Sequence, residues 1–154
     1  MSKPIRALRI YIDTSTVGGC LDEEFMEASC KLFELFRSGQ ATALVSDLLL
    51  RELEEAPIKV QEILPSLPQS SIEPVLLDDE AAYLKDRYLA QGVVQTKHSN
   101  DALHVAIAVV ARADMIVSWN FKHIVHFDKM RGFNAVNLQE GYARLDIFSP
   151  LEVV

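Results

Sequence analysis

The stretch RALRIYID at residues 6–13 decides the fold, because an aliphatic run ends there on an acid. Leucine and isoleucine at this density are typical of a strand buried inside a parallel sheet. The polar triplet TST at residues 14–16 follows at once. We therefore expect a buried first strand that ends at Asp13 and continues into a polar loop.

The rest of the chain alternates between helical and strand-like segments. Helices are predicted where apolar residues recur every three or four positions and where Gly or Pro ends the pattern. They cover residues 23–37, 47–56 with Ser46 and Asp47 as caps, a short piece between Pro65 and Pro68, 79–91, 100–112 with Ser99 as cap, and a helical turn at 121–130. Further strands are predicted at residues 42–45, 72–77, 115–119 and 135–138, and residues 145–148 form a candidate edge strand. Five strands separated by helices predict an α/β fold, a three-layer α/β/α sandwich with a mostly parallel five-stranded sheet.

Length and composition favour one domain over residues 1–154. A chain of this size buries enough apolar surface to fold without a disulfide or a structural metal. Cys20 and Cys30 form no CxxC pair and no zinc-spaced cluster, which favours a reducing cytosol. No signal segment opens the sequence, and apolar runs such as residues 102–111 are too short to cross a bilayer. We expect a cytoplasmic protein with no membrane contact.

The formal net charge of −7 argues against loose electrostatic binding to nucleic acid, for which a basic surface is the usual sign. Excess acid is still compatible with nucleic-acid chemistry if several carboxylates gather in one cleft and divalent cations offset them. The positions of the acids therefore decide the functional class.

Three acids stand at positions that a parallel sheet brings to its ligand-binding edge. Asp13 ends the central strand, where the alternative role is a loop cap. Glu52 shares its helix face with Leu49 and Leu53, although most helical Glu residues simply face water. Asp101 lies in the first turn of a very apolar helix, where the alternative is a favourable helix-dipole contact.

Together these carboxylates predict a site for a hard divalent cation. Two unneutralised carboxylates repel by about 4 kcal/mol at roughly 4 Å with an effective dielectric of about 20. A cation removes this repulsion, and oxygen-only ligands favour Mg²⁺ or Mn²⁺ over zinc. Such ions activate water and stabilise the charge that develops in phosphodiester cleavage.

The sequence resembles the PIN domain family, many of whose members are ribonuclease toxins of the VapC type. The resemblance rests on YIDTST around Asp13, SDLLLRELEEA around Glu52, NDALHVAIAVVARAD around Asp101 and VSWNFKHI around Asn120, in this order along nearly the whole chain. It implies a PIN-like doubly wound fold and Mg²⁺- or Mn²⁺-dependent cleavage of RNA. It also implies frequent homodimers and an antitoxin protein as partner of the toxin.

Asn120 stands where family members often carry a fourth acid. An amide oxygen ligates a cation weakly and adds no charge, so the sequence favours one metal ion or a weak second one. We include Asn120 with Asp13, Glu52 and Asp101 in the predicted catalytic set, with the three acids as metal ligands.

Other side chains near these motifs have weaker signals. Lys122, His123, Lys97 and His98 are candidates for phosphate contacts, with solvated surface groups as the more common alternative. His104 reads best as a hydrogen-bonded core histidine. Thr14 and Ser15 offer hydroxyls to Asp13 or to a bound water, and Trp119 and Phe121 are more often core residues than base-stacking platforms.

Two other functions compete with the ribonuclease interpretation. A haloacid-dehalogenase-type phosphotransferase also begins with an Asp at the end of the first strand, but it needs a second acid two residues later, where this chain has Ser15. A PIN-like module that binds RNA or a protein without cutting is favoured by Asn120 and the acidic net charge. The joint presence of three mutually repelling acids favours catalysis over that module.

Overall fold

Five parallel strands form one sheet in the order β3-β2-β1-β4-β5. The computed structural model describes residues 6–154, and the predicted domain start at residues 1–5 lies outside the described part. The strands are β1 (Leu8–Ile12), β2 (Ala41–Ser46), β3 (Ile72–Val75), β4 (Met115–Val117) and β5 (Asp146–Phe148). The predicted α/β fold is confirmed, and every strand pair is parallel where the sequence predicted a mostly parallel sheet.

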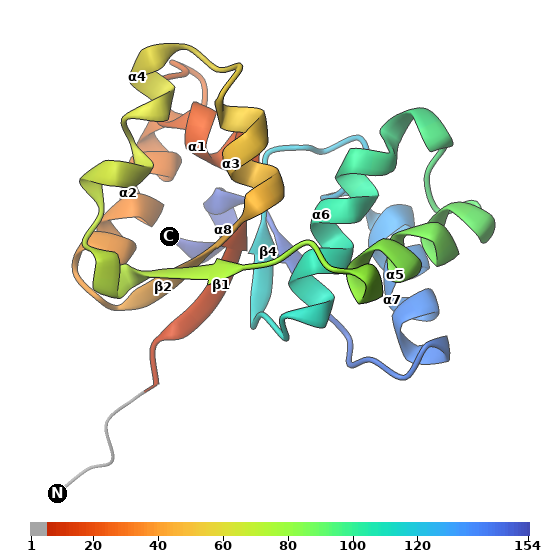
Figure 1. The fold of residues 1–154 in the computed structure, drawn as a ribbon. Coiled ribbons are helices and arrows are strands. Elements are labelled where there is room, and N and C mark those ends of the chain that lie inside the picture. The colour runs from red at the N-terminus through yellow and green to blue at the C-terminus, as the bar shows by residue number, and fades with distance from the viewer. Residues whose placement is uncertain (1–5) are drawn as a thin grey trace, which may run out of the picture.

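Helices cover both faces of this sheet (Figure 1). The α-helices are α1 (Thr14–Gly19), α2 (Met26–Arg37), α3 (Asp47–Leu53), α4 (Ile58–Gln61), α5 (Asp79–Ala90), α6 (Ser99–Val110), α7 (Phe127–Gln139) and α8 (Pro150–Val153). Short 3₁₀ turns are η1 (Leu64–Ser66), η2 (Gln69–Ser71) and η3 (Thr96–His98). In Figure 1, α1 to α4 and α8 gather on one side of the strands, and α5, α6 and α7 gather on the other.

Strand alternation divides the buried residues into two cores, one on each face of the sheet. Tyr11 in β1 and Leu44 in β2 belong to the core that α5, α6 and α7 cover. Ile10 and Ile12 in β1 and Val45 in β2 belong to the core under α2 and α3. Both cores contain fully buried residues, so the central strand β1 is enclosed from both sides.

The predicted strand at residues 135–138 is wrong, because these residues lie inside α7. Phe133, Val136 and Asn137 are buried at helical spacing, which is the pattern that orients α7 against its neighbours. The fifth strand is instead β5, which the candidate edge strand at residues 145–148 contains. A short alternating stretch inside a longer helical pattern produced the error.

Helix starts also differ from the sequence prediction, and α7 begins at Phe127 where a helical turn was predicted from residue 121. The expected polar loop after β1 is the short helix α1, because the Asp13 side chain accepts a hydrogen bond from the Thr16 backbone N–H and caps it. Helix α2 begins at Met26 and not at residue 23, and residues 22–25 form a turn. Ser99 is the first residue of α6, so it is not the predicted cap. The predicted cap Ser46 is confirmed, since it accepts from the Leu49 N–H.

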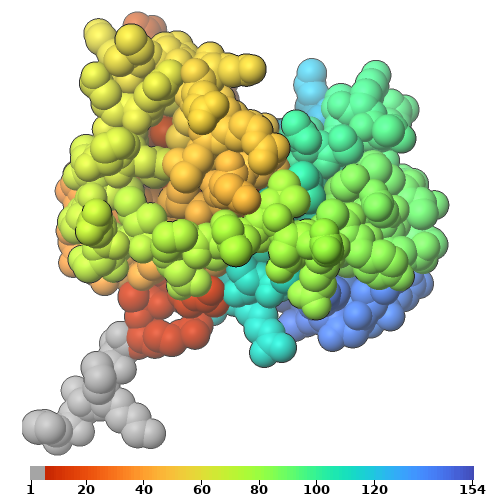
Figure 2. Space-filling model, viewed as in Figure 1, coloured from red at the N-terminus to blue at the C-terminus, as the bar shows by residue number. Residues whose placement is uncertain are grey.

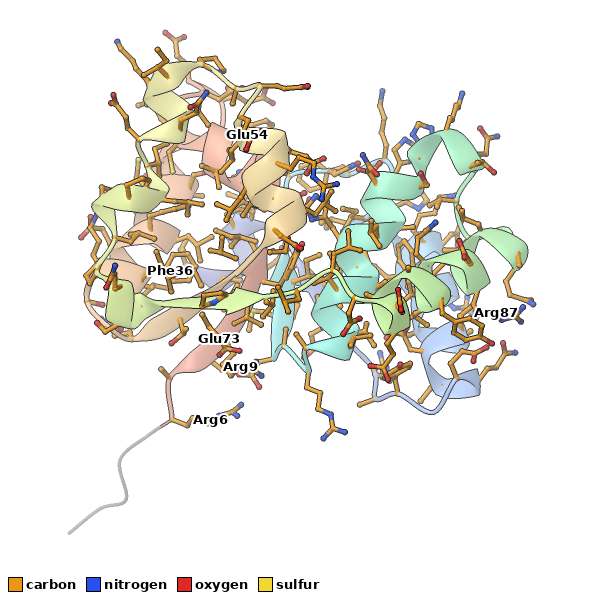
Figure 3. All side chains as sticks on the ribbon, viewed as in Figure 1. Arg6, Arg9, Phe36, Glu54, Glu73 and Arg87 are labelled. Atoms are coloured by element: carbon orange, nitrogen blue, oxygen red, sulfur yellow. The ribbon has the colours of Figure 1, made fainter. Side chains whose placement is uncertain are left out.

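The chain places β2 and β3 on one side of β1 and then β4 and β5 on the other side, so the strand order reverses between β1 and β4. In open α/β sheets, ligands bind beyond the carboxyl ends of the strands at such a switch point. The opposite edge carries Arg9 and Glu73, which lie together below the strands in Figure 3. Among residues 6–154, no helix has both the length and the apolar character needed to span a membrane.

Candidate active site

Four elements meet at the carboxyl edge of the sheet. Asp13 follows β1, Glu52 lies near the end of α3, Asp101 lies in the first turn of α6, and residues 118–120 follow β4. The surface is hollowed between α3 and the N-terminal end of α6 in the space-filling view (Figure 2). The predicted site residues therefore come to one edge of the sheet from separate parts of the chain.

Asp13 is held by hydroxyl and backbone donors. It is 5 % exposed, and its Oδ1 accepts from Ser15 Oγ at 2.7 Å, from Thr16 Oγ1 at 3.0 Å and from Thr16 N at 3.1 Å. Its Oδ2 accepts from Ser118 Oγ at 2.6 Å. These bonds confirm that the Ser15 hydroxyl contacts Asp13, and they fix the carboxylate without an Arg or Lys partner. Asp13 is thus both the cap of α1 and a buried carboxylate that, within residues 6–154, forms no ion pair with Arg or Lys.

Glu52 is the end of a buried hydrogen-bonded chain. Its Oε1 accepts from Thr14 Oγ1 at 2.7 Å and lies 2.5 Å from His104 Nε2. On the other side of the ring, His104 Nδ1 lies 2.6 Å from the Tyr11 hydroxyl, which lies 2.8 Å from Ser46 Oγ. His104 Nε2 donates to Glu52, because an ionised carboxylate only accepts, and the Tyr11 and Ser46 hydroxyls continue the chain from the other ring nitrogen. Among residues 6–154, no buried side-chain nitrogen or oxygen lacks a hydrogen-bond partner.

This chain sets the ionisation of Glu52. Burial raises the pKa of Glu52, but the hydrogen bonds from His104 and Thr14 and the charge interaction with His104 outweigh burial, so the pKa falls below its usual value. Glu52 is therefore an anion at neutral pH. The predicted orientation of Glu52 toward the sheet edge agrees with these contacts, while Glu54 and Glu55 are exposed.

Asp101 has the opposite electrostatic setting. Burial raises its pKa, and the charge of Asp13 raises it further, whereas His123, a hydrogen bond from Asn120 and His104 lower it. The net pKa lies above the usual value for Asp. The charge of Asp13, the smallest of these causes, therefore acts on Asp101 from the neighbouring strand end.

Asn120 contributes its amide in a way that the sequence did not indicate. Its Oδ1 accepts from the backbone N–H of His123 at 2.9 Å and of Lys122 at 3.2 Å, so the amide oxygen caps the following turn. The Asn120 side chain also lowers the pKa of Asp101. Asn120 therefore positions the loop after β4 and supports Asp101, and its oxygen is already in use.

Two histidines, His98 and His123, lie next to Asp101. The rings of His98 and His123 stack with centroids 3.6 Å apart at an interplanar angle of 24°. His98, Asp101 and His123 each present one ligand atom, and these atoms all lie within 4.8 Å of one another. Burial, followed by the charge of His98, lowers the pKa of His123. Within residues 6–154, this is the one group of three or more His, Cys, Asp or Glu residues whose ligand atoms all lie within 4.8 Å of one another. The carboxylates of Asp13, Glu52 and Asp101 therefore do not all lie within that distance of one another.

Several supporting residues were not identified from the sequence. Tyr11 and Ser118 are buried polar partners of the site, and nothing local in the sequence distinguishes them from ordinary core residues, whereas Ser46 was predicted only as a helix cap. His104 is buried as predicted, yet it also contacts Glu52. Its spacing of three residues from Asp101 on one helix face was the available signal. Trp119 is a core residue that stacks on Phe25, whereas Phe121 is 45 % exposed.

Comparison with known proteins gives a family and a fold. The family model described as PIN domain matches residues 9–122. Comparison with curated proteins gives no match. Among solved structures, the chain is similar to VapBC2 from Rickettsia felis bound to a promoter DNA fragment, with 14% identity, a TM-score of 0.58 and coverage of 92% of this chain and 98% of that chain.

Two further solved structures share the fold. DNA-bound VapBC from Salmonella typhimurium is 18% identical with a TM-score of 0.56, covering 93% of this chain and 98% of that one. Mycobacterium tuberculosis VapC20, described as a sarcin-ricin loop cleaving toxin, is 14% identical with a TM-score of 0.50, covering 89% and 98%. At this identity the likeness concerns the fold, whereas the family follows from the match over residues 9–122. With that match, and with the acids on one edge of a parallel sheet in the expected order, this chain belongs to the PIN domain family.

Proposed function

We propose that residues 1–154 form one metal-dependent ribonuclease domain that hydrolyses RNA phosphodiester bonds and acts as the toxin of a toxin–antitoxin pair. One observation carries the proposal: Asp13, Glu52 and Asp101 line the switch point of the sheet, and within residues 6–154 none of them forms an ion pair with Arg or Lys. Uncompensated carboxylates at such a place are costly unless a cation binds there.

The donor set fits Mg²⁺ or Mn²⁺. Asp13 Oδ2 accepts a bond from Ser118 alone, so it keeps acceptor capacity. Both hydrogen bonds recorded for Glu52 fall on Oε1, which leaves Oε2 for another partner. Mg²⁺ typically uses one or two carboxylates and retains several waters, so the three carboxylates need not all bind the ion directly.

Each acid has a distinct role in this proposal. Asp13 is the most rigid ligand, because four donors hold its carboxylate. Asp101 is the second direct ligand, and its raised pKa reflects a charge that a bound cation would stabilise. Glu52 stays anionic and orients water or substrate from the wall that α3 forms. The bound ion supplies water activation and neutralises developing charge at the phosphate.

RNA is the proposed substrate. Support comes from the PIN domain match and from the fold likeness to VapC20, which is described as a sarcin-ricin loop cleaving toxin. Lys97 and Lys122 are exposed next to His98 and His123, where they offer local positive charge to a phosphate backbone despite the net charge of −7. We expect this binding to weaken steeply with salt.

A cognate antitoxin protein and a second copy of the chain are the proposed partners, in the cytoplasm. Support comes from the fold likeness to VapBC complexes. Multi-angle light scattering would measure the mass of the purified chain, for which we expect a homodimer. A monomeric mass at micromolar concentration would remove the dimer from the proposal and leave the nuclease intact.

The nuclease is tested by RNA cleavage with Mg²⁺ or Mn²⁺. We expect cleavage by the wild type, none in chelator, and none by Asp13→Asn or Asp101→Asn. Glu52→Gln should be impaired, whereas the matched control Glu55→Gln, on an exposed position of the same segment, should cleave normally. Cleavage that survives both Asp substitutions, or that persists in chelator, contradicts the proposal.

The second candidate is a PIN-like module that binds RNA or a protein without cutting it. The capping role of the Asn120 oxygen favours this candidate, since a residue so engaged adds nothing to a second metal position. The two functions separate in one assay. RNA that is retained on the wild type with Mg²⁺ but stays uncut identifies the binding module.

A further inference from the structure

We propose that His98, Asp101 and His123 form a second metal site, selective for an imidazole-preferring divalent ion of the Zn²⁺ class and distinct from the carboxylate site for Mg²⁺. The three ligand atoms come from two places in the chain and lie within 4.8 Å of one another. The inference does not depend on ribonuclease activity, because it concerns which ion the chain binds.

The position of the three residues is fixed by backbone hydrogen bonds. His98 precedes α6, and its N–H donates to the Gln95 carbonyl at 2.9 Å. Asp101 lies three residues after His98, so the two side chains are on the same face of the start of α6. His123 donates its N–H to Asn120 Oδ1 at 2.9 Å, and the next residue, Ile124, is fully buried. Both imidazoles are therefore carried on ordered turns.

The stacked rings bring the imidazoles to the same side of Asp101. Their centroids lie 3.6 Å apart, so the ring nitrogens are near neighbours. A zinc ion with ligands at about 2.0–2.2 Å separates tetrahedral ligand atoms by about 3.4 Å. Atoms that lie within 4.8 Å of one another reach that separation by small side-chain rotations. None of the hydrogen bonds between side chains of residues 6–154 occupies a ring nitrogen of His98 or His123.

The composition of the group distinguishes a metal from a phosphate. Two imidazoles beside exposed lysines suggest an anion at first sight, but the carboxylate of Asp101 within the same group repels a phosphate. A cation is attracted to that carboxylate and is ligated by both rings. The N-terminal dipole of α6 opposes a cation, yet the negative charges of Asp101 and the nearby Asp13 offset it.

Ligand type then selects the ion. Imidazole nitrogen suits Zn²⁺, Co²⁺ and Ni²⁺, whereas Mg²⁺ prefers oxygen donors. Two histidines and one aspartate leave a fourth tetrahedral position open, as in catalytic zinc sites. Asp101 belongs to both sites, so ions at the two positions would lie next to each other along the hollow.

The test is calorimetric titration of the metal-stripped chain with Zn²⁺ alone, without RNA. A Cys30→Ser background removes the exposed thiol as a competing ligand. We expect one Zn²⁺ per chain, with affinity reduced by about tenfold or more in His98→Ala and in His123→Ala, since each removes one ligand. The matched control His126→Ala, an exposed histidine of the same loop, should bind as the background does.

A second measurement identifies the ligands. Co²⁺ in place of Zn²⁺ should give visible absorption bands of nitrogen and oxygen ligation that disappear in His123→Gln, a conservative variant that keeps the size of the side chain. Unchanged Zn²⁺ affinity in both His→Ala variants overturns the proposal, and so does the absence of Zn²⁺ binding. Asp13→Asn should reduce Zn²⁺ affinity less than either His→Ala variant. An equal loss would place the ion among the carboxylates and overturn the second site.

Discussion

The two edges of the sheet carry similar charged groups and treat them in opposite ways. At the amino edge, the Arg9 guanidinium binds both oxygens of Glu73 and the carbonyl groups of Ala111 and Arg112, and Asp114 accepts from Arg6 and from the Arg9 N–H. At the carboxyl edge, Asp13 and Glu52 are held by hydroxyls and one histidine. The acids at the amino edge form ion pairs with arginine, whereas those at the carboxyl edge have no Arg or Lys partner within residues 6–154.

The difference separates charges that stabilise the fold from charges kept for a ligand. The hydrogen bond from Arg9 lowers the pKa of Glu73, and the bond to Glu73 raises the pKa of Arg9, so both ions favour the folded state. Burial and Asp13 raise the pKa of Asp101, so its ion opposes the folded state. Functional sites are often assembled at such a cost in stability.

The largest expected difference between the edges is in RNA cleavage. Asp13→Asn should reduce the rate by at least about 100-fold, the scale of losing one charge-stabilising group. The matched substitution at the amino edge, Asp114→Asn, should leave the rate per folded molecule unchanged, because Asp114 bonds Arg6 and Arg9 at the opposite ends of the strands from Asp13. Initial rates with Mg²⁺ measure both. Equal losses would show that the edges do not differ in function.

The next effect concerns the buried chain that ends on Glu52. Tyr11→Phe removes the hydroxyl that bonds both Ser46 Oγ and His104 Nδ1, so each of these two atoms loses one hydrogen bond inside the core. The free energy of unfolding should fall by about 1–3 kcal/mol. Tyr83→Phe is the matched control, since Tyr83 is 57 % exposed. Urea unfolding compares the two variants. An unfolding free energy of Tyr11→Phe equal to that of the control would mean that the hydrogen bonds of Tyr11 do not stabilise the fold.

A smaller expected effect is a change in the free energy of unfolding that has opposite signs for substitutions at the two edges. Without divalent ions, Asp101→Asn should raise the free energy of unfolding by about 0.5–1 kcal/mol, because it removes a charge that burial and Asp13 disfavour. Asp114→Asn should lower it by a similar amount, because Asp114 pairs with Arg6 and bonds the Arg9 N–H. Melting temperatures in chelator measure both signs.

Adding Mg²⁺ sharpens this comparison. The wild type should gain stability by binding the ion in the folded state, and Asp101→Asn should lose most of that gain. Asp114→Asn should keep it. A destabilised Asp101→Asn in chelator would mean that Asp101 is a structural acid like Asp114.

The smallest effect is the pH dependence of the Arg9–Glu73 pair. The pKa of Glu73 is lowered in the folded state, so its contribution is complete above the unfolded value of about 4.3 and is lost as the pH falls through the folded value. Wild type should exceed Glu73→Gln in unfolding free energy by about 1 kcal/mol or less at pH 6, because Glu73 is 38% exposed. The difference should shrink toward pH 3. A difference that grows on acidification contradicts the ion pair.

The positions of the candidate site's acids could largely be predicted, because two of them follow local rules. Asp13 ends a buried strand, and Asp101 begins an apolar helix, so their places at one sheet edge follow from parallel strand order. Glu52 was harder, because a helical Glu beside leucines has no local signal that it bonds Thr14 and His104. The oxygen of Asn120 was predicted as a weak ligand, and its use as a cap depends on the turn at residues 121–124.

The sequence by itself determined the α/β class, the parallel sheet and the edge on which the acids lie, because apolar periodicity and strand ends are local properties. Only the tertiary structure decided that α7 includes residues 135–138, that Tyr11 and Ser46 support Glu52 through His104, and that His98 stacks on His123. Those facts depend on which elements pack together and at what rotation. Residues far apart in the chain meet only when both cores are formed, so no local pattern encodes their contact.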